Sequence, residues 1–230
     1  MSVIFIEKDN LNKYIKKKVK PANVILDIGC GINPQKIIKP KIHICVEPYS
    51  EYVKKLMEKT QFGNFVYLTM SAEEALMRFP DKSIDSIFMI DLIEHIDKES
   101  GVILLSQCER VAKKQIIVFT PLGFFPQEYI KDRKDLWGMD GGFFQEHKSG
   151  WELQDFDDSW DLLCVKEFHF DDGYGNRFEK PYGAIFAVKS FKDNSPKRTV
   201  TNLIIKNIVP SAIEKIIVKI RNKMKKIFFS

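Results

Sequence analysis

The fold class of this 230-residue chain is decided by the stretch Val24-Ile25-Leu26-Asp27-Ile28-Gly29-Cys30-Gly31-Ile32-Asn33-Pro34. Its first five residues, rich in branched apolar side chains, predict a buried strand with an acid near its end. Two glycines, one residue apart, allow a sharp turn and a close approach of a ligand to the main chain. Asn33 is a suitable helix cap and Pro34 suits the first helical position, so we expect a helix to begin there. A strand, a glycine-rich turn and a helix start indicate a site for a nucleotide-like ligand.

The spacing of the glycines narrows the class of ligand. A phosphate-binding P-loop needs Gly-Lys-Ser/Thr, and no such sequence follows Gly31. The dinucleotide fingerprint needs a glycine at its sixth place, which Pro34 occupies here. The remaining pattern, Asp-x-Gly-x-Gly from Asp27 to Gly31, resembles motif I of the class I S-adenosylmethionine-dependent methyltransferases. That cofactor carries an amino group and a sulfonium, and a carboxylate such as Asp27 suits these positive charges.

Apolar, β-rich runs recur along the chain and alternate with segments of helical periodicity. The predicted strands cover about 24–28, 42–46, 65–69, 84–90, 115–119, 162–169 and 183–189. Helical spacing follows Ser50, Ser71 and Ser100, and Ser71 forms a capping box with Glu74. The alternation predicts a parallel, doubly wound sheet, whereas the turn-rich segment 171–182 predicts that the last two strands pair antiparallel.

These elements resemble the class I methyltransferase fold across about residues 22–190. The resemblance implies an α/β protein with a three-layer Rossmann-like methyltransferase fold, whose seven-stranded, mostly parallel sheet has an antiparallel last strand. We place this domain at residues 1–190, followed by a linker at 191–201 and a basic amphipathic helical tail at 202–230. The chain departs from the family pattern after motif I, because Pro40 shortens the expected helix and Asn33 replaces a third glycine.

The ends of the predicted strands supply the candidate cofactor ligands, because open α/β sheets bind ligands beyond the carboxyl ends of their strands. Glu47 ends the second strand, where an acid can accept both ribose hydroxyls or, alternatively, be a solvated surface residue. The resemblance places the adenine beside the turn after the third strand and the methionine half beside the end of the fourth. The candidate cofactor-binding residues are Asp27, Gly29, Cys30, Gly31, Glu47, Pro48, Ser71, Ala72, Asp91 and Leu92.

Two histidines are the candidate catalytic bases. His95 ends the stretch Asp91-Leu92-Ile93-Glu94-His95 after the fourth strand, and an imidazole titrates near neutrality. His147 lies in a long aromatic segment after the fifth strand, which we expect to build the acceptor pocket. The alternative role of both histidines is to hold loops by hydrogen bonds.

Two local resemblances accompany these histidines. An acid-x-x-Glu-His group related to Asp91, Glu94 and His95 holds a divalent metal in quinone-pathway O-methyltransferases, but we assign no metal ligand here. Stretches similar to His-x-Ser-Gly-Trp at 147–151 occur in methyltransferases of glycan assembly. Trp151 then either lines the pocket or packs in the core.

The composition is that of a globular cytoplasmic protein. Hydrophobic residues make up 44% and charged residues 29% of the chain, which is ordinary. The four cysteines are scattered without a CxxC pair, which favours buried thiols over disulfides or a zinc site. No signal peptide and no run of roughly 20 apolar residues is recognisable in the sequence.

Charge is distributed unevenly along the chain. The net charge is +5, yet residues 197–230 contain nine Lys or Arg and one acid, Glu214, so the body of the chain is acidic. From Pro210 onward, isoleucines share one helical face and lysines crowd the other, which suits the surface of an anionic membrane. Docking on the domain itself and a dimer contact are the alternatives. The acidic body argues against a nucleic-acid partner.

We expect a cytoplasmic S-adenosylmethionine-dependent methyltransferase, peripheral on the inner membrane face. Its acceptor would be an oxygen of a small molecule or of a glycan or lipid-linked intermediate, methylated by in-line transfer. The alternatives are a non-catalytic S-adenosylmethionine-binding regulatory module and an RNA methyltransferase that grips phosphates with its basic tail. The chain lacks the Asn/Asp-Pro-Pro-Tyr/Phe motif of enzymes that methylate exocyclic base amines.

Overall fold

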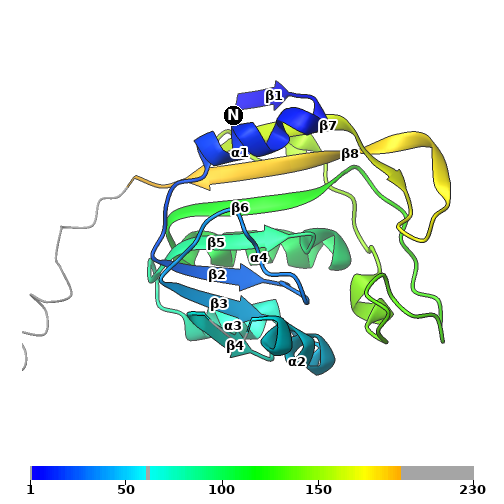
Figure 1. Cartoon of the computed structure of the whole chain (residues 1–230). Helices are drawn as coiled ribbons and strands as arrows, with labels where there is room; N and C mark the ends of the chain where they lie inside the picture. The colour runs from blue at the N-terminus through cyan, green and yellow to red at the C-terminus, as the bar shows by residue number, and fades with distance from the viewer. Residues whose placement is uncertain (1, 61–62, 193–230) are drawn as a thin grey trace, which may run out of the picture. The chain divides into compact units, whose positions relative to one another are not determined.

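The computed structural model describes residues 2–60 and 63–192, which build one eight-stranded sheet with flanking helices (Figure 1). The strands are β1 (Ser2–Phe5), β2 (Val24–Ile28), β3 (Ile42–Val46), β4 (Phe65–Leu68), β5 (Ile84–Ile90), β6 (Ala112–Leu122), β7 (Trp160–Asp171) and β8 (Arg177–Ser190). Their order in the sheet is β1-β7-β8-β6-β5-β2-β3-β4. This arrangement confirms the expected α/β, Rossmann-like sheet.

The directions of the strands determine at which edge of the sheet a ligand site is expected. Neighbouring strands pair in parallel except for β8, which runs antiparallel to both β6 and β7, as the turn-rich segment 171–182 predicts. The chain order reverses between β2 and β5, because β3 and β4 extend the sheet on one side and β6 on the other. Ligands of such sheets bind at the carboxyl ends of the strands beside the reversal.

Side chains alternate between the two faces of the sheet, and helices cover both. The helices are α1 (Leu11–Lys18), α2 (Ser50–Lys59), α3 (Ala72–Arg78) and α4 (Lys98–Val111). Leu26 and Ile28 of β2 belong to the core cluster that contains residues of α3 and α4. Ile25 belongs instead to the cluster that includes α1, and α2 packs through Leu56 against Cys45. Period-two burial in the strands thus explains the three layers.

The helix that the sequence predicts after β2 does not form. Residues 29–41 contain no helix, because Pro34 and Pro40 leave too short a stretch with free amides between them. Asn33 therefore caps no helix. Its side-chain oxygen instead accepts a hydrogen bond from the Lys59 Nζ at 3.0 Å.

Other differences concern the extent of the elements. The sheet has eight strands rather than seven, because the short N-terminal strand β1 pairs with β7, more than 150 residues away. The helix α4 begins at Lys98, two residues before Ser100, and β6, β7 and β8 are longer than predicted. The Ser71–Glu74 capping box is confirmed.

The tail lies outside this description. The chain divides into the units Met1–Lys192 and Asp193–Ser230, and the second unit is not among the described residues. The predicted tail helix at 202–230 and most of the predicted linker at 191–201 therefore stay predictions. Within residues 2–60 and 63–192, no helix combines the length and the apolar character needed to cross a membrane.

Candidate active site

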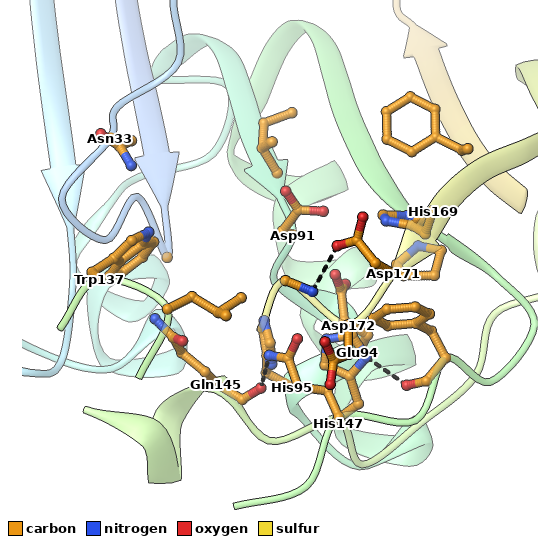
Figure 2. A pocket seen from close by; sticks show the side chains of 18 of the residues that line it. Asn33, Asp91, Glu94, His95, Trp137, Gln145, His147, His169, Asp171 and Asp172 are labelled. Carbon is orange, nitrogen blue, oxygen red and sulfur yellow. Dashed lines mark hydrogen bonds between the residues drawn. The ribbon is translucent and has the colours of Figure 1, made fainter. Parts of the chain in front are cut away.

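A cavity of about 560 Å³ opens where β2, β5 and β6 end (Figure 2). Its volume is in the range of small-molecule sites. Acidic, basic and histidine side chains line much of it, and they are Lys8, Asp27, Asp91, Glu94, His95, His147, His169, Asp171 and Asp172. Six of the residues proposed from the sequence line this cavity, namely Asp27, Gly29, Cys30, Asp91, His95 and His147.

The glycine turn forms one wall of the cavity and requires its glycines. Gly29 has a φ of +67°, and a Cβ placed on it would lie 2.6 Å from Cδ1 of Leu92. Gly31 has a φ of +51°, and its Cβ position lies 2.2 Å from Cη2 of Trp137. Backbone conformation and close packing therefore both exclude a side chain at these two positions.

Asp27 anchors the segment that replaces the expected helix. Its Oδ2 accepts hydrogen bonds from the Gln35 amide and from Nε2 of His43, each at 2.8 Å. Burial would lower the pKa of His43, but the Asp27 carboxylate raises it to about 9, so the pair is ionic at neutral pH. Gln35 then accepts hydrogen bonds from the amides of Ile37 and Ile38. Asp27 therefore shapes the turn in addition to lining the cavity.

Glu47 lies behind the glycine turn instead of in the cavity. It is only 5% exposed, and its two oxygens accept hydrogen bonds from the amides of Gly31 and Tyr49, each at 3.0 Å. Burial raises the pKa of Glu47. The acid assigned to the ribose hydroxyls thus holds the turn in this structure.

Asp91 projects from the end of β5 with an unusual backbone. Its φ is +49°, which a non-glycine residue adopts at a cost and which is frequent at functional sites. The surrounding cavity walls desolvate the carboxyl and raise its pKa to about 7, although the side chain still faces the cavity. No hydrogen bond to this carboxylate is present among the described residues. Figure 2 shows Asp91 pointing into the open space between Trp137 and His169.

The remaining candidate cofactor residues do not line the cavity. Ser71 caps α3 in its box with Glu74, and Ala72 begins that helix. Pro48 is exposed beyond β3, and Leu92 packs on Gly29. Their assignment to the cofactor stays a prediction.

The two candidate bases lie 52 residues apart in the chain and meet in the cavity. The rings of His95 and His147 pack edge to face at a centroid distance of 4.7 Å. Nδ1 of His95 lies 3.1 Å from the Glu146 carbonyl, and Nδ1 of His147 lies 2.7 Å from the Phe125 carbonyl. Because a carbonyl only accepts, both Nδ1 atoms carry the proton and both Nε2 atoms keep a lone pair.

The cavity keeps these imidazoles neutral. Burial, and then the neighbouring His147, lowers the pKa of His95 to about 4, and burial also lowers the pKa of His147. A neutral imidazole can accept a proton or bind a metal ion, so the arrangement suits either role. The alternative role, loop support, is also present, because Nδ1 of each ring hydrogen-bonds a backbone carbonyl of the long segment after β6.

Glu94 completes this group. It is 2% exposed, its Oε2 accepts a hydrogen bond from Thr120, and its Oε1 has no partner. Burial and the adjacent Asp91 raise its pKa. A buried carboxylate oxygen without a partner is costly and indicates a missing ligand or proton.

Three of these groups can hold a divalent metal ion. One ligand atom from each of Glu94, His95 and His147 lies within 4.8 Å of the others. Two neutral imidazoles and a carboxylate are a donor set for Zn²⁺ or Mn²⁺, and the carbonyls on both Nδ1 atoms are the usual outer partners. The resemblance to metal-binding O-methyltransferases in the sequence involves Asp91, Glu94 and His95. In the structure, the third member of the group is His147 instead of Asp91.

His169, a third histidine of the cavity, is not among the residues predicted from the sequence. It lies in β7, its ring is 4.9 Å from that of Phe125, and its buried Nε2 has no partner. Burial, followed by Lys8 and His147, lowers its pKa to about 4. His169 is the last residue of the predicted strand 162–169, so the rule that ligands bind at the ends of strands could have pointed to it.

Trp151 is a core residue and does not line the cavity. It is fully buried, and its Nε1 donates hydrogen bonds to the Ile93 carbonyl and to Oγ of Ser149 at 3.1 Å. A Cβ on Gly101 would lie 2.6 Å from its ring. The amides of Lys148 and Ser149 also bond the Glu94 carbonyl, so this stretch fastens the long segment to the end of β5.

Comparison with known proteins agrees with this geometry. A family model described as a methyltransferase domain matches residues 26–119, from β2 to the middle of β6. No match was found among curated proteins.

Solved structures with TM-scores above 0.5 share the fold at low sequence identity. A putative methyltransferase from Bacillus halodurans is 15% identical, with a TM-score of 0.54, over 79% of this chain and 98% of that one. TehB from Haemophilus influenzae is 14% identical, with a TM-score of 0.51, over 80% of this chain and 62% of that one. Magnesium protoporphyrin IX methyltransferase from Synechocystis, solved with bound SAM, is 15% identical, with a TM-score of 0.46, over 79% and 77%.

Proposed function

We propose that this protein, whose residues 26–119 belong to the methyltransferase-domain family, transfers a methyl group from S-adenosylmethionine to an oxygen of a hydroxyl-bearing acceptor. The observation that carries the proposal is the free carboxylate of Asp91 beside the Gly29 turn. An ionised carboxylate facing a cavity with no described partner suits the amino group and sulfonium of the cofactor. Asp27 lines the same wall, with its charge balanced by His43.

The transfer itself needs alignment and exclusion of water. The cofactor supplies the reactive methyl group, so the protein mainly positions the acceptor oxygen in line with the sulfur. The Nε2 lone pairs of His95 and His147 are available to take the proton that the hydroxyl loses as the new bond forms. A binding module without catalysis would not need two neutral imidazoles in the same cavity.

The lining of the acceptor side favours a glycan-type or other polyhydroxylated molecule. Phe125, Phe168 and Phe170 provide flat apolar surfaces, and His169 and Asp171 provide polar atoms near them. A few polar groups among aromatic surfaces are typical of sites that orient a small ligand. An acidic cavity also repels a phosphate backbone, which argues against an RNA acceptor.

A divalent metal ion at Glu94, His95 and His147 is a second candidate for activating the hydroxyl. When bound, the ion would lower the pKa of a coordinated hydroxyl. In that case the histidines are ligands rather than bases, while Asp91 keeps its role toward the cofactor. Activity after treatment with a chelator, followed by addition of Zn²⁺ or Mn²⁺, separates the two roles, because a histidine base needs no added ion.

We also propose that the basic tail at 202–230 holds the protein to an anionic membrane surface, where a lipid-linked glycan would be available. Flotation with liposomes of the full chain and of a chain ending at Phe191 tests this. If neither protein floats, the membrane proposal is wrong, while the methyl transfer is unaffected.

Calorimetric titration with S-adenosylmethionine and with its demethylated product tests the proposed cofactor. Wild type is expected to bind both, and Asp91→Ala is expected to lose most of the affinity. The Met77→Ala variant, changed at an exposed residue of α3, is the control and should bind as wild type does. Equal binding by wild type and Asp91→Ala would contradict the assignment.

A further inference from the structure

The segment around Trp137 closes the part of the site that the sequence assigns to the nucleoside. We propose that residues 134–145 form a gate over the nucleoside half of the cofactor site, latched by Asp135 and Tyr52, and that the gate must open before the cofactor binds. The inference rests on the proposed function, because it takes S-adenosylmethionine as the ligand and Glu47 as the ribose-binding acid that the sequence predicts. It adds a conformational step that the proposed function does not require.

The two halves of the cofactor site differ in access. Asp27, Gly29 and Asp91, on the methionine side, line the cavity. On the nucleoside side, Glu47 is 5% exposed and does not line it. Each Glu47 oxygen keeps a second lone pair, but a carboxylate that is only 5% exposed cannot accept ribose hydroxyls until the residues that cover it move.

Trp137 is the residue in front of this half. The atom Cη2 of its ring lies 2.2 Å from the Cβ position of Gly31, whose amide holds Glu47. The ring also packs edge to face on Tyr52 at a centroid distance of 4.7 Å. Figure 2 shows Trp137 beside the turn that carries Asn33, on the opposite side of the cavity from the histidines.

Asp135 makes the segment a self-contained unit. It is 4% exposed, and its carboxylate accepts hydrogen bonds from the amides of Trp137, Met139 and Gly141 at 2.8, 2.9 and 3.0 Å. The Gly138 amide bonds the Asp135 carbonyl at 2.9 Å. Because these bonds are internal, the segment can move without losing them.

Few polar contacts fasten this unit to the body of the domain. The Tyr52 hydroxyl of α2 donates a hydrogen bond to the Asp135 carboxylate and accepts one from Nε2 of Gln145. Tyr49 adds a stacked contact with Phe144 at a centroid distance of 5.4 Å. The hydroxyl–carboxylate bond is charge-assisted and buried, so it is the strongest single tie.

The latch sets the apparent affinity for the cofactor. A ligand that binds only the open form has a dissociation constant raised by the inverse of the open fraction. Loss of a hydrogen bond to a charged group shifts such an equilibrium by roughly tenfold or more. The Tyr52→Phe variant removes the hydroxyl and keeps the ring, so it should bind the cofactor about tenfold more tightly.

Tryptophan fluorescence reports the gate directly. The chain has three tryptophans, and Trp151 and Trp160 are buried at 0% and 3% exposure, whereas Trp137 is 37% exposed. In stopped-flow mixing with S-adenosylhomocysteine, we expect the observed rate for wild type to reach a ceiling set by gate opening. Tyr52→Phe should raise that ceiling about tenfold, and Trp137→Phe should abolish the signal. Ile130→Ala, an exposed residue of the same long segment, should match wild type.

Calorimetry with Trp137→Ala completes the test. A gate predicts tighter binding of S-adenosylhomocysteine by this variant, because the covering ring is gone. Weaker binding by Trp137→Ala, or identical rates for Tyr52→Phe and wild type, would overturn the gate and make Trp137 a wall of the occupied site. Binding by Tyr52→Phe with no binding by wild type would support the gate. If no variant binds, the proposed function fails and the gate fails with it.

Discussion

The two walls of the cavity are built in different ways. One wall consists of the turns after β2 and β5, where Gly29 and Asp91 follow directly on buried strands. The other consists of segment 123–150 and the β7–β8 hairpin, which Figure 1 shows beyond the ends of the parallel strands. The first wall depends on short backbone patterns, whereas the second depends on contacts between residues far apart in the chain.

This difference predicts how each wall responds to change. A substitution in the first wall has to fit an unusual backbone conformation and close packing. It should therefore act on cofactor binding. A substitution in the second wall outside residues 134–145 should act on turnover or on stability, because its side chains hold loops and face the acceptor. The four predictions below test that division, from the largest expected effect to the smallest.

Replacing Gly29 should have the largest effect. Gly29→Val combines an unfavourable φ with a clash against Leu92, so cofactor binding should fall below detection while the folded domain persists. Calorimetric titration measures the binding and circular dichroism the fold. The pair Gly29→Ala with Leu92→Ala should recover part of the affinity that Gly29→Ala alone loses, because the clash is removed. No recovery would mean that packing against Leu92 is irrelevant.

Removal of the candidate bases, His95 at the end of the first wall and His147 in the second, should lower turnover by about 10²- to 10⁴-fold, the usual contribution of a general base. His95→Ala and His147→Ala are expected to lose kcat with little change in affinity for S-adenosylmethionine. His169→Ala is the matched comparison within the cavity and should raise KM for the acceptor more than it lowers kcat. An equal loss of cofactor affinity in all three variants would contradict the division between the walls.

Trp151 tests the support of the second wall. Trp151→Ala removes a fully buried ring and its hydrogen bonds to the main chain, and should lower the free energy of unfolding by about 3–5 kcal/mol. Denaturant titration measures the change, with Trp137→Ala as the comparison because that ring is partly exposed. A loss of less than about 1 kcal/mol would show that the stretch 147–151 does not fasten the segment.

The pH dependence of cofactor binding tests Asp91. Its pKa of about 7 means that the carboxyl is protonated, and unable to pair with the cofactor's positive charges, in acid solution. Affinity should therefore rise as the pH increases toward 7, by close to tenfold for each unit below 7. Asp91→Asn should bind weakly with a nearly flat profile between pH 5 and 7. The same slope in that variant would assign the titration to another group, such as Glu94.

Much of the fold was predictable from local patterns. Alternating apolar runs identified the seven strands β2 to β8, and the capping box at Ser71 and Glu74 marked the start of α3. The strand β1 was missed because its four residues are stabilised only by pairing with β7. The helix expected at Asn33 was wrong because local capping preference did not account for the two prolines or for the bonds that Gln35 makes.

The site was predictable to a smaller extent. Asp27, Gly29 and Asp91 were found because a strand end is a local property and parallel strands bring their ends together. Glu47 was identified by the same rule, but its hydrogen bond to Gly31 could not be read from spacing. The pairing of His95 with His147 depends on how the segment 123–150 folds back over the cavity. The sequence of that segment has no helical or strand periodicity from which its path could be predicted.

The amino-acid sequence by itself determined the layered sheet, the glycine turn and the resemblance to methyltransferases, because strand periodicity, glycine conformation and strand-end chemistry act over a few residues. Only the tertiary structure decided which side chains face the cavity, that Trp137 covers Gly31, and that Glu94 keeps an unpaired oxygen beside two neutral imidazoles. Those features arise from contacts between distant segments, whose geometry is set by the packing of the whole domain rather than by any local preference.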